Sequence, residues 1–422
     1  MNKNKQISQT KKETQERRNS LSCKVRDIKI LTRKLNKSQK EHMKMLFLEA
    51  KWLYNYTLSE INKLEDFEEK YKKMLELRKV KEVPVFKSGD KDLEVRELKY
   101  LSSQMKQEVI VQLEKNTQNL SKSKKKGNKV GKLKFKKEFN CINLVQHNIT
   151  YKFTDGRLKL QGMKKTMKVK GLHQLSGEIA NAKLISKPDG YHLKVVTFVE
   201  PEKKKIENCA GIDLGMKDQL VTSNGVKVQF EQLGLPKRQQ RMLKNKKKYS
   251  KNWNKIKLKI NKKFQKINNQ KKDRENKVAH SFKGSLTCIE DLTFKAWQKL
   301  WGRKTAELRL SQIICALEQS TDVIKIDKWF PSTKQCFECG NKKEMGLGER
   351  VYKCSCGHTM SRDLNAAKNI LEEGLKLFTG LGQISQLVET EASALLEKLG
   401  KVPHAKVSLV DEARRYPSLD GC

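Results

Sequence analysis

Apolar residues recur at three- and four-residue steps in two segments of the N-terminal third of the chain. The first segment carries Met43, Leu46, Phe47, Ala50, Leu53, Tyr54 and Leu58. The second runs over about residues 101–120 and includes Met105, Val109, Val111 and Leu113. This spacing is typical of amphipathic helices, and Ser38 and Glu41 are spaced as a capping box before the first one. The pattern therefore predicts a small helical domain over residues 36–122.

Short β-prone segments lie on either side of this helical region. Residues 23–32 predict one strand, and the segments within 139–199 alternate with turn signals such as Asp155-Gly156. Together they predict a small β-barrel or sheet formed by residues 23–35 and 123–205.

The other N-terminal segments are basic and polar. Residues 1–22 predict a disordered basic leader. Residues 121–137 (SKSKKKGNKVGKLKFKK) predict a basic linker. Its lysines Lys124, Lys125 and Lys126 are candidate contacts to nucleic-acid phosphates.

A further domain of α/β type begins near Ile206. Residues 209–215 (CAGIDLG) predict a buried strand, and two more strands around the Asn224-Gly225 turn complete an antiparallel meander. Residues 286–292 and 322–327 predict a fourth and a fifth strand, separated by a helix at about 306–318. Another helix is expected after Ser361.

Three acidic residues occupy particular places in this pattern. Asp213 lies within the first strand, where a lone buried charge costs several kcal/mol unless it is paired or binds a metal. Glu290 ends the fourth strand and Asp363 lies in the first turn of the last helix, positions where acids also occur for structural reasons alone. Together the three form the carboxylate pattern of RNase H-like nucleases, whose oxygen ligands gather two Mg²⁺ ions about 3.5–4 Å apart. We therefore predict that they are catalytic and bind magnesium.

Four cysteines are spaced as zinc ligands. Cys336 and Cys339 form a C-x-x-C pair, and Cys354 and Cys356 follow as a C-x-C pair 14 residues later. This spacing predicts a zinc ribbon, a closed structural site for one Zn²⁺ that supplies folding energy. Because the second pair is shorter than usual, His358 is a possible substitute ligand, although a packing role suits a lone histidine better. The other six cysteines are expected in the core or tail: Cys23, Cys141, Cys209, Cys288, Cys315 and Cys422.

Residues 237–277 hold 18 lysines and arginines against 2 acidic residues. An apolar stripe nevertheless keeps helical spacing through them, formed by Trp253, Ile256, Ile260, Phe264 and Ile267. The pattern predicts one helix that buries this stripe and turns its charge outward. Its lysines Lys246, Lys247 and Lys248 would then contact phosphates; the alternative is a solvated lysine surface.

The overall charge agrees with a nucleic-acid partner. Lys and Arg number 91 against 48 Asp and Glu, a formal net charge of +43. A large polyanion is the simplest partner for such a charge, although a lysine-rich proteome would also raise it. The sequence contains no apolar run long enough to span a membrane. Residues 1–19 are polar and charged throughout, so they are not expected to act as a signal peptide. A cytoplasmic, prokaryotic location is expected, in which clustered cysteines bind metal and do not form disulfides.

Several motifs resemble the TnpB family of transposon-encoded nucleases and the compact type V CRISPR effectors related to it. They are GIDLG (211–215), IEDL (289–292), WFPSTKQCFECG (329–340) and YKCSCGHTMSRDLNAAKNI (352–370). The resemblance implies an RNA-guided DNA endonuclease that binds a structured guide RNA, reads a short motif beside its double-stranded target DNA and cuts at one RuvC-like site. The matching positions are Asp213, Glu290 and Asp363 for catalysis and the four cysteines for zinc.

The resemblance also implies a multidomain architecture that combines α/β and α+β parts. An RNase H-like (RuvC) nuclease domain would occupy residues 206–332 and 357–380, with the zinc ribbon inserted at 333–356. The N-terminal half would supply a wedge-like β-barrel and a helical recognition domain. Residues 381–422 are expected to form a helix at about 385–399 and then a mobile tail.

Other functions remain open from the sequence. The chain departs from the family in two places, because the approach to Glu290 after His280 and the segment 291–327 are both short. A guided DNA-binding protein with weak or no cleavage, acting as a repressor, is therefore an alternative. A strand-transferring transposase would usually order its acids Asp-Asp-Glu, and a zinc-ribbon RNA-binding protein would give the buried Asp213 no role.

Overall fold

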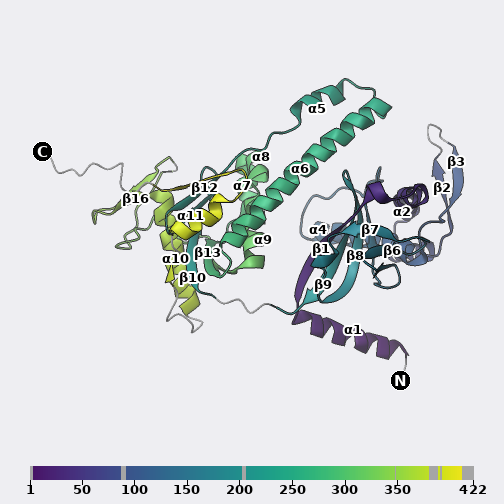
Figure 1. The fold of residues 1–422 in the computed structure, drawn as a ribbon, viewed down its shortest axis with the longest axis horizontal. Coiled ribbons are helices and arrows are strands. Elements are labelled where there is room, and N and C mark those ends of the chain that lie inside the picture. Colours follow the sequence, from purple (N-terminus) through teal and green to yellow (C-terminus); the bar gives the residue numbers. More distant parts are fainter. Residues whose placement is uncertain are drawn as a thin grey trace. The chain divides into compact units, whose positions relative to one another are not determined.

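The structure is a computed structural model that describes residues 3–86, 92–201, 206–346, 348–379, 388–389 and 392–410. The chain divides into two compact units, Met1–Glu202 and Lys203–Cys422. Each unit has its own sheet (Figure 1). Each also has its own hydrophobic core. Of the helices described, none combines the length and apolarity needed to cross a membrane.

The first unit is built on a seven-stranded sheet. Its strand order is β4-β8-β9-β1-β7-β6-β5. The strands are β1 (Ser22–Ile30), β4 (Cys141–Leu144), β5 (Tyr151–Thr154), β6 (Arg157–Leu160), β7 (Met167–Lys170), β8 (Glu178–Lys187) and β9 (Gly190–Val199). The strand predicted from residues 23–32 thus pairs with strands more than 130 residues later in the chain.

Three helices share one hydrophobic core with this sheet. They are α2 (Lys37–Asn62), α3 (Phe67–Leu77) and α4 (Ser103–Lys125). The unit also contains two short helices, η1 (Thr32–Lys34) before α2 and η2 (Leu172–Gln174) after β7, and a hairpin of β2 (Glu82–Phe86) and β3 (Leu93–Glu97). The capping box of α2 is formed by Asn36 and Gln39. The prediction of Ser38 and Glu41 was wrong because Ser38 already lies in the first helical turn.

Residues 1–22 were predicted to be a disordered leader, and this is wrong for residues 3–19. They form α1 (Lys3–Asn19). The segment contains neither Gly nor Pro, so no residue in it opposes a helix. Its last turn is also held by ion pairs, because Arg17 and Arg18 lie 2.7 Å and 2.6 Å from the two carboxylate oxygens of Glu178.

The predicted linker at 121–137 begins later than expected. Helix α4 continues through Lys125, and Lys126 forms its C-cap. Lysine is a good helix former, and positive charges in a last turn complement the helix dipole. Lys124, Lys125 and Lys126 are therefore exposed at the end of a helix.

The second unit contains a mixed sheet in the order β14-β13-β10-β11-β12-β18, in which β18 covers Ala405–Leu409. Strands β10 (Asn208–Asp213), β11 (Leu220–Thr222) and β12 (Val226–Phe230) form the predicted antiparallel meander, whose turn contains Gly225 at a φ of 85°. Strands β13 (Ser285–Glu290) and β14 (Asp322–Ile326) run parallel to β10. The short strand β17 (Val388–Glu389) also pairs with β10.

Helix α10 (Arg362–Thr379) packs directly on the centre of this sheet. A Cβ at Gly211 of β10 would overlap the backbone oxygen of Ala367 and the side chain of Leu371, both in α10. A Cβ at Gly374 of α10 would overlap the side chain of Cys288 in β13. Glycine at these two positions therefore lets the helix approach the two strands that end in Asp213 and Glu290.

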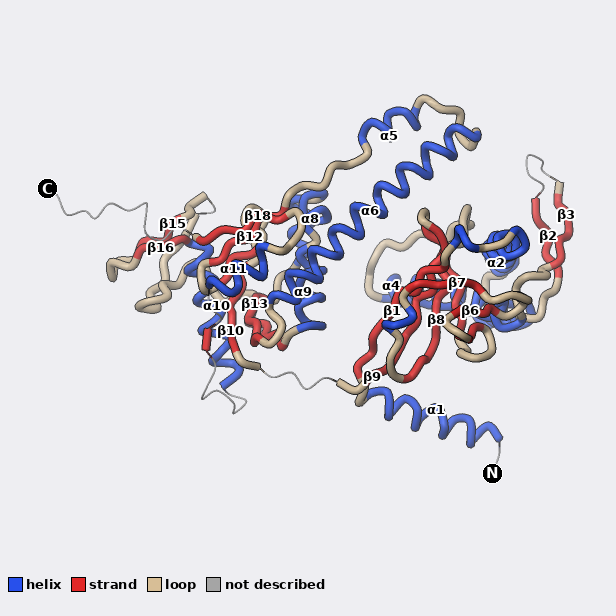
Figure 2. The backbone as a smooth tube through the Cα atoms, in the orientation of Figure 1, coloured by secondary structure: helices blue, strands red, loops and turns tan. Residues whose placement is uncertain are grey.

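The basic segment 237–277 is not one helix. It forms α5 (Lys237–Lys244), a loop, and α6 (Lys251–Ser281), with α5 folded back beside the outer end of α6 (Figure 2). The break occurs because Ser250 caps α6 by accepting a hydrogen bond from the Trp253 N–H, after Tyr249 at a φ of 68°.

The predicted apolar stripe of α6 is only partly buried. Ile260 and Ile267 are 6% exposed, whereas Trp253, Ile256 and Phe264 are half-buried. The outer part of the helix packs on α5, which has no buried residue of its own. The prediction of a buried stripe is therefore wrong for Trp253, Ile256 and Phe264, which are only half-buried.

The segment between β13 and β14 forms three helices where one was predicted. They are α7 (Phe294–Trp301), α8 (Arg303–Leu308) and α9 (Leu310–Ser320). The expected helix at 306–318 is interrupted at Arg309, whose φ is 58°. This side chain pairs with Glu275 of α6 at 2.8 Å, so the ion pair fixes the break against α6.

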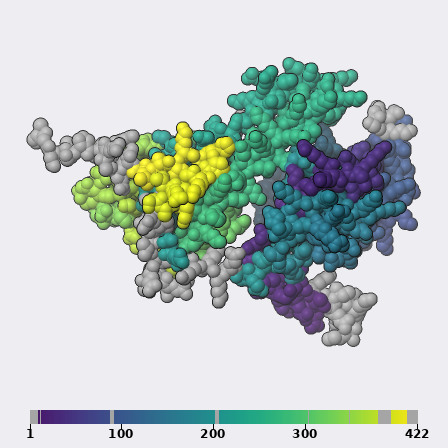
Figure 3. All heavy atoms as spheres, in the orientation of Figure 1, coloured from purple at the N-terminus to yellow at the C-terminus, as the bar shows by residue number. Residues whose placement is uncertain are grey.

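The C-terminal region contributes to the second core. Helix α11 (Ala392–Gly400) buries Leu395 and Leu399, and β18 (Ala405–Leu409) pairs with β12 along five residues. Figure 3 shows this segment, in yellow, lying on the surface of the second unit. The expected helix thus begins later than predicted. The prediction of a mobile tail is wrong for residues 405–409, because they form a strand at the edge of the sheet. Residues 411–422 lie outside the described part.

Candidate functional site

Strand alternation places two of the predicted acids on one face of the second sheet. Cys209 of β10 and Leu286 and Cys288 of β13 belong to the core beneath α10. Because successive side chains of a strand point to opposite faces, Asp213 and Glu290 follow on this same face. The parallel register pairs Ile212 with Ile289, so the two acids end neighbouring strands side by side.

The third acid reaches this point from the helix. Asp363 lies in the first turn of α10, over the carboxyl ends of β10 and β13. All three carboxylates are half-buried. The structure therefore brings together residues that are separated by up to 150 positions in the sequence.

Mutual repulsion marks the three acids as a cluster. Burial, and then the negative charges of Glu290 and Asp363, raise the pKa of Asp213 well above its usual range, while Arg362 opposes the shift. Burial also raises the pKa of Glu290, against a hydrogen bond from Ser332. A site of this kind favours bound cations, which would offset the repulsion.

Sequence reasoning missed the side chains that hold these acids. The Ser332 hydroxyl donates to Oε1 of Glu290. Arg362 donates to Oδ1 of Asp363 at 2.9 Å, and Arg350 lies 3.7 Å from Oδ2. Arg362 adjoins Asp363 in the sequence and could have been suspected, but no local pattern points to the other two.

Two buried asparagines connect α10 to the cysteine-bearing loop. Asn369 donates to the backbone oxygens of Ser332 and Gln335, both at 2.8 Å. Asn365 donates to Gln335 and accepts from the Phe337 N–H. The helix that carries Asp363 is thereby fixed to the loop that carries Ser332 and Cys336.

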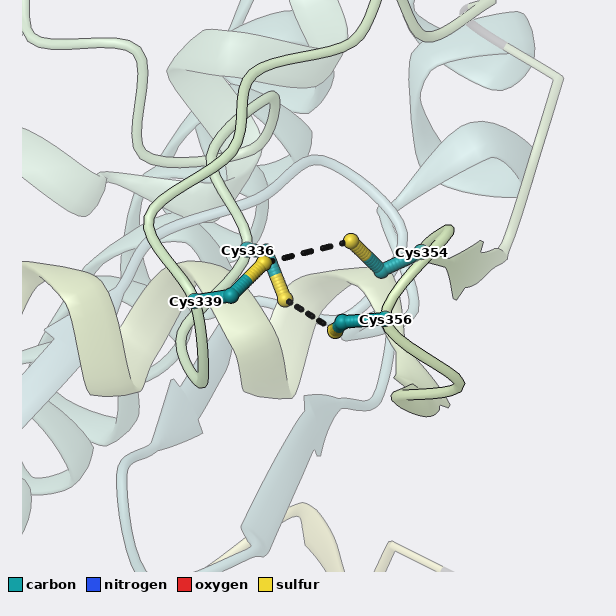
Figure 4. Close-up of side chains that lie close together, drawn as sticks. All are labelled: Cys336, Cys339, Cys354 and Cys356. Atoms are coloured by element: carbon teal, nitrogen blue, oxygen red, sulfur yellow. Dashed lines mark hydrogen bonds between the residues drawn. The ribbon is translucent and has the colours of Figure 1, made fainter.

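The four predicted zinc ligands converge. Cys336 and Cys339 follow β14, and Cys354 and Cys356 lie in the hairpin of β15 (Val351–Lys353) and β16 (Thr359–Ser361). All four Sγ atoms lie within 4.8 Å of one another (Figure 4). The Sγ atoms of Cys336 and Cys356 are 3.8 Å apart and those of Cys339 and Cys354 are 3.5 Å apart.

These distances fit a tetrahedral zinc ion. A Zn–S bond of about 2.3 Å places tetrahedral sulfurs about 3.8 Å apart. A hydrogen bond from the Cys356 backbone lowers the pKa of the Cys354 thiol to about 6, which favours the thiolate that zinc requires. The cluster can therefore hold a structural zinc.

His358 is not part of this cluster. Its Nδ1 lies 3.9 Å from a carboxylate oxygen of Glu338, and its backbone oxygen accepts a hydrogen bond from Cys354. The C-x-C spacing reaches four ligands without it because Gly357, at a φ of 92°, closes the turn after Cys356. Histidine substitution is therefore unnecessary.

The acids are arranged differently from the thiols. Within the described ranges, the four cysteines are the one group of three or more metal-binding side chains that converge on a single point. Asp363 is instead turned toward its arginines and Glu290 toward Ser332. Carboxylates that do not converge on a single point suit a site in which they would share two metal ions and not surround one.

The predicted lysine contacts lie on exposed surfaces. Lys246, Lys247 and Lys248 occupy the loop between α5 and α6, and all three are exposed. Tyr249, 60% exposed, follows them with the Lys248 ammonium 5.4 Å from its ring. A tip of this composition suits a polyanion.

Changing Lys246, Lys247 and Lys248 together to Gln is expected to weaken nucleic-acid binding for all sequences alike. It should also flatten the slope of log affinity against log salt by up to about 0.7–0.9 per lost phosphate contact. Fluorescence anisotropy across a salt series measures both effects. The exposed lysines Lys283, Lys353 and Lys398 provide a triple control of equal charge, and identical slopes for the two variants would contradict a role for this loop.

Comparison with known proteins finds relatives of the same family that the sequence motifs resemble. Residues 313–370 match the model of the Cas12f1-like TNB domain. A Streptomyces pristinaespiralis protein named "Putative RNA-guided DNA endonuclease" is 30% identical over 183 residues, which are 40% of this chain and 45% of that protein. The TnpB-like protein L79 of Acanthamoeba polyphaga mimivirus is 32% identical over 143 residues, 30% of this chain and 27% of that protein. The matched segments are thus similar to proteins of the TnpB family.

The TnpB matches cover less than half the length of these curated relatives. Among solved structures, a Cas12f1–sgRNA–target DNA complex aligns over 83% of this chain and 99% of that one, with a TM-score of 0.46 and 14% identity.

Proposed function

We propose that the chain is an RNA-guided DNA endonuclease that hydrolyses phosphodiesters at one RuvC-like site. The observation that carries this proposal is the meeting of Asp213, Glu290 and Asp363 on one face of the second sheet. The sheet supports it, because its meander followed by two parallel strands is the order expected of an RNase H-like domain.

The three carboxylates would hold two Mg²⁺ ions. When bound, the ions supply a water of lowered pKa and stabilise the charge on the leaving 3′ oxygen. Ser332 orients Glu290 for this task, and Arg362 limits the repulsion around Asp213. A metal ligand must be deprotonated, and the pKa of Asp213 is raised. Metal affinity should therefore fall as the pH falls through this raised pKa, because the Asp213 carboxylate becomes protonated.

The remaining parts of the molecule would bind nucleic acid. The formal charge of +43 and the exposed lysines of the α5–α6 loop and of the end of α4 suit a guide RNA and a double-stranded DNA target. By the family resemblance, the wedge-like barrel and helical recognition domain would correspond to the first unit. The zinc ribbon would stabilise the fold and take no part in the chemistry.

One observation favours the alternative of a guided binding protein with weak or no cleavage. Asp363 is already paired with Arg362 and lies near Arg350. An acid held in this way must exchange an arginine for a metal ion before it can act. Slow exchange would leave binding intact and cleavage poor.

Cleavage of a matched target separates the two functions. The chain is expressed with its flanking DNA, and the RNA that copurifies is sequenced to identify the guide. The complex is then given plasmids that carry a matched or a mismatched target, with Mg²⁺. Cutting of the matched plasmid alone supports the nuclease, whereas stable binding without cutting supports the alternative.

A further inference from the structure

A cavity of about 640 Å³ lies in the second unit, on the face of the sheet opposite to the three acids. Its walls come from the loop after β10, the end of β12, the inner half of α6 and α8. The residues used below are Met216, Lys217, Phe230, Lys237, Lys271, Arg274, Lys304 and Glu307. A volume of this order suits one nucleotide better than a small inorganic ion.

A buried arginine lines this cavity. Arg274 is 2% exposed, and its guanidinium lies 4.1 Å from the centre of the Phe230 ring. Its Nε has no hydrogen-bond partner in the described part of the chain, and Nη2 only reaches the Leu308 backbone oxygen at 3.5 Å. A buried charge without full pairing is costly, so a bound anion would stabilise this guanidinium.

The adjacent carboxylate of Glu275 does not form an ion pair with Arg274. Glu275 is held by Arg309, whose Nε and Nη2 lie 2.8 Å and 3.2 Å from its two oxygens. Arg274 is therefore left with weaker, longer-range attraction from Glu275.

Further cations surround the opening. Lys217, Lys237 and Lys304 are exposed at its rim, and Lys271 is half-buried in its wall. Burial, and then the charge of Arg274, lower the pKa of Lys271. Two carboxylates, Glu231 and Glu307, also line the cavity, but the five cations outnumber them, so the wall carries a net positive charge that a bound anion would stabilise.

The cavity lies at the same edge of the sheet as the three acids but on the opposite face, because Phe230 packs with Ala210 and Ile212 in the core that faces away from α10. Strand β12 runs in the direction of β10, because β11 is antiparallel to both. Phe230 therefore ends β12 at the edge where Asp213 ends β10. Lys217 follows Asp213 by four residues, which limits their Cα separation to about 14 Å.

We propose that this cavity binds a phosphodiester of the single DNA strand that enters the nuclease site. Arg274 and Lys271 would pair with the phosphate, and the Phe230 and Met216 side chains would contact the sugar or base. The inference rests on the proposed function for its choice of DNA over RNA, since DNA is the strand to be cut at this edge.

The test measures binding of a short fluorescent single-stranded DNA to the full chain without Mg²⁺. Arg274→Gln should weaken binding about tenfold, the loss of one buried charge-assisted contact. Lys271→Gln, a change in a half-buried wall, should flatten the salt slope by about 0.7. The double variant Lys283→Gln/Lys398→Gln, at exposed sites outside the cavity, is the matched control and should bind as the wild type does.

Thermal melting shows whether Arg274→Gln folds, and Lys271→Gln decides the result if it does not. Unchanged DNA affinity and salt slope in the folded pocket variants would overturn the proposal. An equal loss with an RNA of the same sequence would overturn the assignment to DNA. If the pocket variants lose DNA binding while the wild-type complex cuts no matched target, the DNA-binding role of the pocket is supported and the proposed nuclease function is contradicted.

Discussion

Replacing Asp213, Glu290 or Asp363 with Ala is expected to abolish target cleavage while leaving guide RNA and target DNA binding unchanged. Loss of one shared ligand removes metal-ion stabilisation worth several kcal/mol in the transition state, which corresponds to about a thousandfold in rate or more. Because the three acids would act as a unit, the single losses should be similar and a double variant should lose little more. Single-turnover cleavage and filter binding measure the two properties separately.

Asp291 offers a matched control for this experiment. It follows Glu290 directly but is exposed, and strand alternation turns it away from the face that carries the other acids. Asp291→Ala should therefore cut like the wild type. Wild-type cutting by any of the three site variants would remove that residue from the site.

The sequence was most informative where a local pattern has only one physical solution. The Asn224-Gly225 turn gave the meander its register, and the parity of β10 and β13 placed Asp213 and Glu290 on one face. The four cysteines converge as their spacing predicted. In each case the information lies within a few consecutive residues.

Features that depend on distant partners escaped sequence reasoning. Helix α1 is anchored by Glu178, about 160 residues later, and β18 exists because β12 offers an open edge. Ser332 reaches Glu290 across 42 residues. No periodicity within these segments indicates such contacts, so neither α1 and β18 nor the residues that orient the acids could be found from the sequence.

Replacing Cys339 with Ser is expected to release zinc and to loosen the part of the site that carries Asp363. A purified wild-type chain should hold about one equivalent of zinc, and the free energy of such binding is about 10 kcal/mol or more, much of it folding free energy of the ribbon. Without the metal, the 332–337 loop loses one of its two restraints. The other is its set of hydrogen bonds to Asn365 and Asn369. Elemental analysis and hydrogen exchange over residues 332–343 and 350–365 measure the loss.

Two further variants show whether the ribbon acts through this loop. Cys315→Ser changes an exposed cysteine of α9 outside the cluster, and it should retain both zinc and activity. Asn369→Ala keeps all four thiols but removes donors to Ser332 and Gln335, which should cost about 1–3 kcal/mol of stability. If the ribbon positions Asp363 through this loop, Asn369→Ala should reduce cleavage while zinc content stays at one equivalent. Full activity in a zinc-free Cys339→Ser chain would contradict the ribbon's role, because α10 would then hold Asp363 without it.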